Sequence, residues 1–300
     1  MVPIVIKVFI LAVVQGFCEL LPVSSSAHVI IAEKLMGLDP TTPAMTFMLV
    51  LLHTGTMFAV IGYFWNTWRS RYFSSAPAFW QFVRHLVVAT VCTGIVGYGL
   101  MKVIEHWELT GTSSADVEQL FGNTRLIACA LAAVGVLIIV SGRRSAAGRQ
   151  GARGSGFGAL AARDSLQTAD ALWIGVVQGL CLPFRGFSRS GATISTGLLR
   201  GLSQQLMENF SFALAVVLTP PVVAREAWRL LKERDALPAG AISGSVQLSL
   251  IGMVASFIAG WLALKWLSRW LESGRWHWFG YYCLAAAVAV FAMTRYLGTA

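Results

Sequence analysis

Two short polar stretches interrupt an otherwise apolar chain, and they hold the residues best suited to chemistry. The first, Val14–His28, places Glu19, Pro22 and three serines directly after an apolar segment. The second, Val177–Thr193, follows the same theme but carries arginine in place of the carboxylate. Buried charges and unpaired hydroxyl groups are costly in hydrocarbon, so polar groups at such places are expected to serve a function.

Glu19 is the first candidate catalytic residue. A carboxylate beside hydroxyl groups at a helix start suits a general base, or one ligand of a hard divalent cation. Gln15 lies one helical turn earlier on the same face and could share that cation. The alternative is a Glu19 that is only structural, paired or protonated, but an intramembrane glutamate favours function.

The three serines and the histidine that follow Glu19 suit an anion. Ser24, Ser25 and Ser26 stand where a second helix is expected to begin, and a helix N-terminus attracts anions through its free N–H groups and its dipole. His28, one turn into that helix, could donate or accept a proton near neutral pH. The plainer interpretation is that Ser24 caps the helix, the other serines bond the backbone, and His28 is a hydrogen-bonded core residue.

Arg189 is the strongest candidate in the second stretch. It stands between Ser188 and Ser190 at another expected helix start, and its planar guanidinium group can pair with phosphate oxygens through two bonds. Thr193, four residues later, adds a hydroxyl group to the same face. A structural ion pair with Glu19 is compatible with that role. Together the two stretches predict a site for a phosphorylated ligand inside the membrane, and a lipid phosphate is the natural candidate.

The composition indicates an all-α polytopic membrane protein. Of the 300 residues, 56% are hydrophobic and 12% are charged, about half of the roughly 25% typical of soluble domains. The net charge of +9 could suggest nucleic acid, but the arginines lie in short loops between apolar segments, as membrane topology requires. The five cysteines are scattered through apolar stretches, which predicts neither disulfides nor a metal site.

The apolar segments predict one membrane domain made of two similar halves. Each half contains a re-entrant helical hairpin, tolerable only if its turn is buried in protein or lines a wet cavity, followed by three transmembrane helices. Repeat 1 covers about 1–142, a flexible cytoplasmic linker rich in Gly, Ala and Ser covers about 143–168, and repeat 2 covers about 169–300. The expected hairpin helices are 2–21 with 24–36 and 170–182 with 188–201, and the expected spans are 43–65, 82–103, 123–140, 209–224, 243–267 and 277–296.

The distribution of positive charge predicts how these halves are oriented. If the arginine-rich loops at Arg69 and Arg143 are cytoplasmic, the N-terminus and the first hairpin lie outside. The second hairpin then enters from the cytoplasm, and the C-terminus lies outside. The two halves therefore have opposite orientation, which is an inverted-topology repeat with its binding site at the two broken segments.

At these residues the chain resembles a bacterial family, the undecaprenyl-diphosphate phosphatases of the bacitracin-resistance type. The family's first motif, [E/Q]-x-x-x-E followed by L-P-V-S-S-x-x-H, stands here as QGFCELLPVSSSAH over Gln15–His28. Its second motif, P-G-x-S-R-S-x-x-T, stands as RGFSRSGAT over Arg185–Thr193. The segments 47–64 and 194–215 are also similar, so the resemblance covers both halves.

The resemblance implies a hydrolase that converts undecaprenyl diphosphate to undecaprenyl phosphate and inorganic phosphate, which recycles the lipid carrier of peptidoglycan synthesis. It also implies a bacterial inner membrane, an active site open to the periplasm and a divalent cation, Mg²⁺ or Ca²⁺. By position, Glu19 becomes the essential acidic residue, Ser25 a candidate nucleophile, His28 a candidate acid or base, and Arg189 the phosphate clamp. The remaining polar lining would consist of Ser24, Ser26, Ser188, Ser190 and Thr193.

Two departures from the family pattern bear on the mechanism. Gln15 stands where many members have a second glutamate, which puts a cation held by paired carboxylates in doubt. Arg185 replaces the motif proline, so the turn before Ser188 must differ. A phosphoserine intermediate, a phosphohistidine intermediate and direct attack by water all stay open, as does a homodimer. A polyprenyl-phosphate transporter that uses the same phosphate site is the rival hypothesis.

Overall fold

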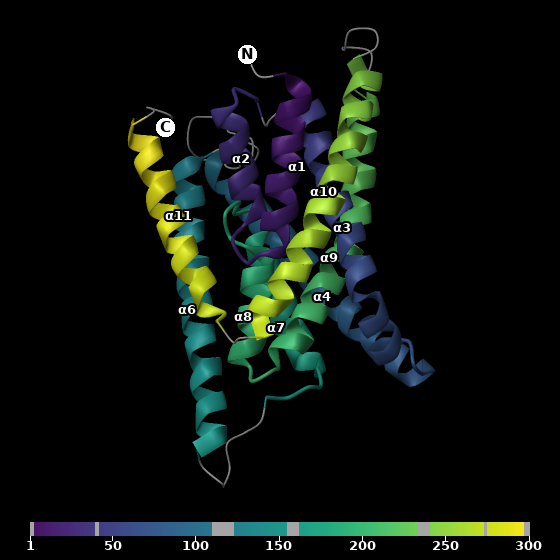
Figure 1. Ribbon diagram of the computed structural model, residues 1–300, viewed down its shortest axis with the longest axis vertical. Helices are drawn as coiled ribbons and strands as arrows, with labels where there is room; N and C mark the ends of the chain where they lie inside the picture. The colour runs from purple at the N-terminus through teal and green to yellow at the C-terminus, as the bar shows by residue number, and fades with distance from the viewer. Residues whose placement is uncertain are drawn as a thin grey trace. The chain divides into compact units, whose positions relative to one another are not determined.

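A computed structural model of the chain describes residues 3–39, 42–109, 123–154, 162–232, 241–272 and 275–296. All regular elements within these residues are helices (Figure 1). They are α1 (Ile4–Leu20), α2 (Ser25–Leu35), α3 (Pro43–Tyr72), α4 (Ala76–Leu109), α6 (Thr124–Gly154), α7 (Thr168–Cys181), α8 (Arg189–Leu199), α9 (Gln204–Lys232), α10 (Ala241–Glu272) and α11 (His277–Tyr296). Six of them, α3, α4, α6, α9, α10 and α11, are long and apolar enough to cross a membrane, which confirms the predicted all-α multi-pass class.

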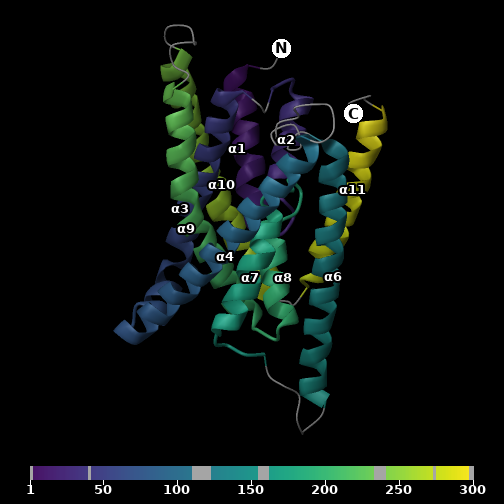
Figure 2. The same cartoon turned by 180° about the vertical axis from the view of Figure 1, so that it is seen from behind.

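The first short pair, α1 and α2, forms the predicted helical hairpin. The two helices lie side by side in both views (Figures 1 and 2). The chain leaves α1 just before Pro22 and enters α2 at Ser25. The far end of α2 is closed by Gly37, whose φ of 66° suits a residue without a side chain. The Lys7 ammonium group donates to the Met36 carbonyl oxygen at 2.6 Å, which ties the start of α1 to the end of α2.

The second short pair, α7 and α8, repeats this arrangement. Ser188 caps α8, because its hydroxyl oxygen accepts from the Gly191 N–H at 3.1 Å. The end of the pair is again tied to its start, because Nε of Arg200 donates to the Asp170 carboxylate at 2.6 Å. Nη2 of Arg163 adds a second bond of 3.2 Å to the same carboxylate oxygen.

The chain forms two compact units, and each combines segments from both halves of the sequence. The first unit comprises Met1–Leu21, Ser25–Asn66 and Ala215–Ser268, and the second comprises Pro22–Ser24, Thr67–Leu214 and Arg269–Ala300. The first hairpin therefore shares a unit with α10, whereas the second hairpin shares a unit with α4.

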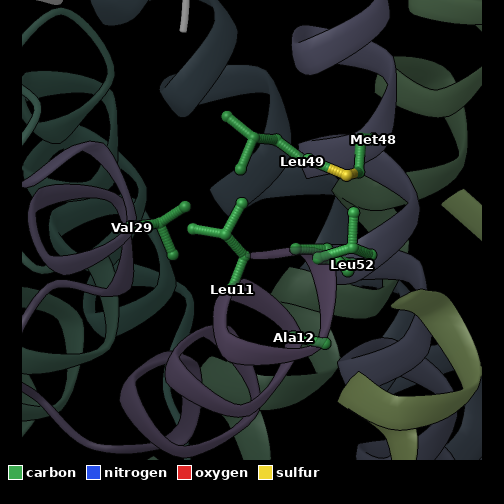
Figure 3. Close-up of a cluster of buried hydrophobic side chains, with 7 residues drawn as sticks. Leu11, Ala12, Val29, Met48, Leu49 and Leu52 are labelled. Atoms are coloured by element: carbon green, nitrogen blue, oxygen red, sulfur yellow. The ribbon is translucent and has the colours of Figure 1, made fainter. Parts of the chain in front are cut away.

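The interior of the first unit is built where α1, α2 and α3 meet. Leu11 of α1, Val29 of α2 and Leu52 of α3 point toward one another in a buried cluster (Figure 3). On another side of α1, Gly16 lies against α10, where an added Cβ would stand 2.5 Å from the Ala259 Cβ and 2.9 Å from the Gly260 nitrogen. A glycine is required here because only a bare backbone allows this approach.

The second unit contains two closely packed helix pairs, α4 with α7 and α6 with α11, which lie side by side in Figure 2. Gly179 of α7 lies against α4, where an added Cβ would stand 2.9 Å from the Thr93 carbonyl oxygen. The Thr93 hydroxyl donates to the Gly175 carbonyl oxygen at 3.1 Å. Gln178 donates to the same hydroxyl at 3.2 Å, so polar bonds reinforce this crossing.

The predicted linker over 143–168 needs a correction. Helix α6 continues to Gly154, so the first part of the segment is helical, and residues 155–161 lie outside the described residues. The following segment is anchored: Nη2 of Arg71 contacts the Asp164 carboxylate at 2.9 Å, and the Ser203 N–H donates to the Arg163 carbonyl oxygen at 2.9 Å. Hydropathy marks only the apolar part of a helix, whereas Arg, Ala and Gln favour its continuation into water.

Candidate functional site

The Glu19 carboxylate is the centre of a polar cluster in the first unit. Glu19 lies in the last turn of α1, and its side chain is only 12% exposed. Its Oε2 atom accepts from the Ser25 hydroxyl at 2.5 Å and from the Gln15 amide at 3.1 Å. Nε2 of His53 lies 3.3 Å from the same oxygen. The structure thus brings together Gln15, Glu19 and Ser25, as predicted, and adds His53.

Ser25 is placed by the break between the two helices. It is the first residue of α2 and is buried. Ser24 before it has a φ of 65°, in the left-handed region that L-residues rarely adopt, and such a conformation costs about 1–3 kcal/mol. Strain of this kind persists where its surroundings enforce it, and here it lies in the turn that brings the Ser25 hydroxyl to Glu19. A hydroxyl group that donates to a carboxylate has a candidate general base in place, which can take its proton as the oxygen attacks.

His53 is the residue that the sequence analysis missed. It lies in the middle of α3, and its Nδ1 atom is 2.7 Å from the Leu49 carbonyl oxygen one turn earlier. This contact orients the ring so that Nε2 faces Glu19. The available signal was a histidine inside an apolar span, since ionisable residues in such spans are rare and usually functional.

The remaining candidates of the first stretch lie near the start of α2. His28 is half-buried three residues after Ser25, which places the two on the same side of the helix. Ser26 is half-buried and Ser24 is buried. Their predicted roles as an acid or base and as phosphate ligands stay predictions.

The Arg189 group lies at the start of α8 in the second unit. Arg189 is half-buried and is the first residue of this helix. The Ser188 hydroxyl caps the helix and lies 3.4 Å from that of Ser190. The Thr193 hydroxyl is buried, donates to the Arg189 carbonyl oxygen at 2.9 Å and lies 2.7 Å from the Ser211 hydroxyl. These bonds rigidify the helix start, and phosphate binding by its side chains stays a prediction.

The donor set around Glu19 does not fit a divalent cation held by the protein alone. The described residues contain no group of three or more His, Cys, Asp or Glu side chains that could hold a metal ion. Mg²⁺ and Ca²⁺ need several oxygen ligands, but Glu19 is the one carboxylate in this cluster and its Oε2 atom already accepts from N–H and O–H groups. The Gln15 amide oxygen is buried without a hydrogen-bond partner and could add a single neutral ligand.

Comparison with known proteins gives matches over nearly the whole chain. Residues 8–289 match the model of the family described as bacitracin resistance protein BacA. The chain is 53% identical over 291 residues to undecaprenyl-diphosphatase 2 of Acinetobacter baylyi, a match that covers 96% of this chain and 97% of that protein. It is 36% identical over 303 residues to an undecaprenyl-diphosphatase of Gluconacetobacter diazotrophicus, with 96% of each chain covered. A Polaromonas undecaprenyl-diphosphatase is 31% identical over 293 residues, which cover 97% of this chain and 95% of that one.

Proposed function

Because the chain belongs to the bacitracin resistance protein BacA family, we propose that the Glu19 cluster is the reacting centre of an undecaprenyl-diphosphatase. The chain is a hydrolase of a lipid diphosphate: it converts undecaprenyl diphosphate to undecaprenyl phosphate and inorganic phosphate. The observation that carries our assignment of the site is the 2.5 Å hydrogen bond from the Ser25 hydroxyl to the Glu19 carboxylate.

This bond supports Ser25 as the nucleophile and Glu19 as its general base. Oγ of Ser25 attacks the terminal phosphorus atom while its proton moves to Oε2 of Glu19. The new O–P bond forms as the bond between that phosphorus and the bridging oxygen breaks, and undecaprenyl phosphate leaves with the electron pair. Water then attacks the phosphoserine as the bond between phosphorus and Oγ breaks, and Oγ regains its proton from Glu19. One proton of the water stays on the released inorganic phosphate and the other passes to solvent. Such reactions depend mainly on positioning and on neutralisation of charge.

From its place in the second motif, we expect Arg189 to bind the terminal phosphate. A guanidinium group pairs bidentately with phosphate oxygens, and the free N–H groups at a helix start favour the same anion. In the bacterial inner membrane, with the first hairpin outside, the reaction would take place at the periplasmic side. The positive charge of the loops at Arg69 and Arg143 supports this orientation.

A transporter of polyprenyl phosphate is the second candidate, because broken helices in repeated halves are common in transporters. A transporter needs a site for an anion, but it needs no nucleophile with a base beside it. The Ser25–Glu19 bond therefore favours catalysis at this site.

The direct test is phosphate release from undecaprenyl diphosphate by the detergent-purified protein. We expect release by the wild type, and a loss of about 100-fold or more in Ser25→Ala and Glu19→Gln. Arg189→Lys should lower turnover at least about tenfold, because lysine cannot form the bidentate pair. Ser70→Ala is the matched control, since Ser70 is an exposed serine at the end of α3. Wild-type rates in Ser25→Ala would contradict the nucleophile, and a folded wild type that binds undecaprenyl phosphate but releases none from the diphosphate would favour the transporter.

A further inference from the structure

We propose that His53 is a positioning residue that holds the Glu19 carboxylate in the orientation needed to accept the Ser25 proton. The inference rests on the proposed function, because it assigns to His53 a part in the same reaction. It is carried by two contacts of one imidazole ring, one to the backbone of α3 and one to the carboxylate.

The backbone contact fixes both the ring and its proton. The Leu49 carbonyl oxygen can only accept, so Nδ1 at 2.7 Å must carry a hydrogen and donate it. When one imidazole nitrogen is bonded to a backbone carbonyl in this way, the other nitrogen is the one that remains for the functional partner. That nitrogen is Nε2, and the ring presents it to Oε2 of Glu19 at 3.3 Å. With Glu19 ionised, as a general base must be, Nε2 carries the hydrogen between the two atoms and donates it to Oε2.

The carboxylate is thereby held from several sides. Gln15 donates from one turn earlier in α1, Ser25 donates from the first residue of α2, and His53 approaches from α3. Each contact comes from a different place in the fold, so together they restrict rotation about the Glu19 side chain. A carboxylate that is free to rotate would leave the Ser25 hydroxyl for part of the time, and misplacement by about 1 Å can reduce a rate by about 100-fold.

The titratable groups of the neighbouring helices can be named. Helix α1 carries Lys7, Cys18 and Glu19, and helix α2 carries His28, Glu33 and Lys34. Helix α10 packs against α3 beside His53, where the Ser256 hydroxyl donates to the Leu52 carbonyl oxygen at 2.9 Å, and residues 246–264 contain no charged side chain. The acid that contacts His53 is Glu19, whose Oε2 lies 3.3 Å from Nε2.

Two substitutions separate this role from a purely structural one. His53→Gln places an amide nitrogen near the position of Nε2, so it keeps the contact with Glu19 and loses the bond to Leu49. His53→Asn places its amide nitrogen near Nδ1, so it keeps the bond to Leu49 and cannot reach Glu19. The measurement is kcat and KM for phosphate release, together with binding of a non-hydrolysable methylene analogue of the lipid diphosphate and the Tm in detergent.

We expect kcat to fall about 10- to 100-fold in His53→Asn, because the Glu19 carboxylate is then misplaced. The kcat of His53→Gln should be at least about fivefold higher than that of His53→Asn, because glutamine keeps the contact with the carboxylate. KM and binding of the analogue should stay within about twofold of wild type, because the positioned proton transfer matters only in the transition state. His106→Gln, at an exposed histidine of α4, is the control. If His53→Asn fails to fold, His53→Ala is assayed with added imidazole, and recovery of kcat is the expected result.

Equal rates in the two variants, or a faster His53→Asn, would overturn the positioning role, and so would an absence of imidazole rescue in folded His53→Ala. A change confined to KM would overturn it as well, because His53 would then act in binding. These outcomes differ from failure of the proposed function, in which the wild type itself releases no phosphate.

Discussion

A single carboxylate oxygen organises the polar cluster at the first hairpin. Oε2 of Glu19 accepts from Ser25 and Gln15 and faces His53, although these residues come from three different helices. A second carboxylate in place of Gln15 would repel Glu19 in this largely buried setting, unless a cation or a proton lay between them. The neutral amide instead donates a hydrogen bond to Oε2 of Glu19. Gln15 in place of a second glutamate therefore changes how the Glu19 carboxylate is kept in place.

Gln15→Glu should make the stability of the Glu19 cluster depend on a divalent cation. The added carboxylate at this fully buried position would destabilise the fold through like-charge repulsion, and Mg²⁺ or Ca²⁺ would relieve it. Binding at 100 times Kd contributes about 2.7 kcal/mol, which corresponds to roughly 5–10 °C in Tm for a chain of this size. Thermal unfolding in detergent, with either cation or with a chelator, measures the effect.

Without lipid diphosphate, the wild type should show no such shift. Gln15→Asn, which adds no charge, is the matched control for the altered side chain. A cation-dependent rise of Tm in the substrate-free wild type would mean that the chain alone holds a cation.

At the scale of the elements, the two hairpins are closed by corresponding contacts. When the two Val-Gln-Gly segments and the two Ser-x-Ser segments are aligned, Lys7 corresponds to Asp170 and Met36 to Arg200. Lys7 bonds the Met36 carbonyl oxygen, and Asp170 pairs with Arg200. The chemistry differs, but in both hairpins the start of the first helix is tied to the end of the second. This supports the proposal that the halves are repeats.

The close crossing of α1 and α10 depends on Gly16. A methyl group there would stand 2.5 Å from the Ala259 Cβ and 2.9 Å from the Ser256 carbonyl oxygen, so Gly16→Ala should destabilise by about 1–3 kcal/mol through overpacking. Gly94→Ala is the control, because nothing lies within 4 Å of its added Cβ in α4. That substitution should be neutral or stabilising by up to about 1 kcal/mol. The Tm of each variant in detergent tests these two expectations. Equal Tm values for Gly16→Ala and Gly94→Ala would contradict the close crossing of α1 and α10.

The contact between α3 and the segment before α7 should depend on pH through Asp164. Burial alone would raise the pKa of this carboxyl group, but the hydrogen bonds from Ser203 and Arg71 hold it below its usual value. A lowered pKa in the folded state adds stability above the unfolded value of 3.8, and that stability is lost as pH falls through the folded pKa. The Asp164 side chain is 64% exposed, so the contribution should stay below about 1 kcal/mol.

Asp164→Asn should therefore lower Tm slightly between pH 5 and 7, and the difference from wild type should shrink as the pH approaches 3. The measurement is the Tm of both proteins across this range at one ionic strength. A difference that grows toward acid pH would have the wrong sign and would exclude the proposed linkage.

The helix breaks could be predicted from sequence because their signals are local. Pro22, the serines and Gly37 mark the first hairpin, and Ser188 and Gly201 mark the start and end of α8. Ser25 beside Glu19 was also predictable, since the two are close along the chain. His53 was not selected, because its partner lies on another helix and only tertiary packing brings them together. The lengths of α3 and α6 were underestimated, because hydropathy stops where the helices continue into polar sequence.

At the scale of the whole molecule, the two halves exchange their packing partners. Gly16 of the first hairpin lies against α10, which belongs to the second half, and the corresponding Gly179 lies against α4, which belongs to the first half. Each compact unit therefore needs both halves of the sequence. Such an exchange is expected if the two halves are structural repeats that fold together. The orientation of each half in the membrane then depends on the presence of the other half.

The orientation can be tested by labelling single cysteines in a variant that lacks the native ones. The charge pattern predicts that Asp39→Cys, between α2 and α3, reacts from the periplasm with a maleimide that cannot cross membranes. Ser74→Cys, between α3 and α4, and Arg275→Cys, before α11, should react only after the cells are lysed. All three residues are exposed, so a lack of reaction in intact spheroplasts would report the side of the membrane. Labelling of Asp39→Cys and Ser74→Cys from the same side would contradict a transmembrane α3, and labelling of Arg275→Cys from the periplasm would contradict the inverted repeat.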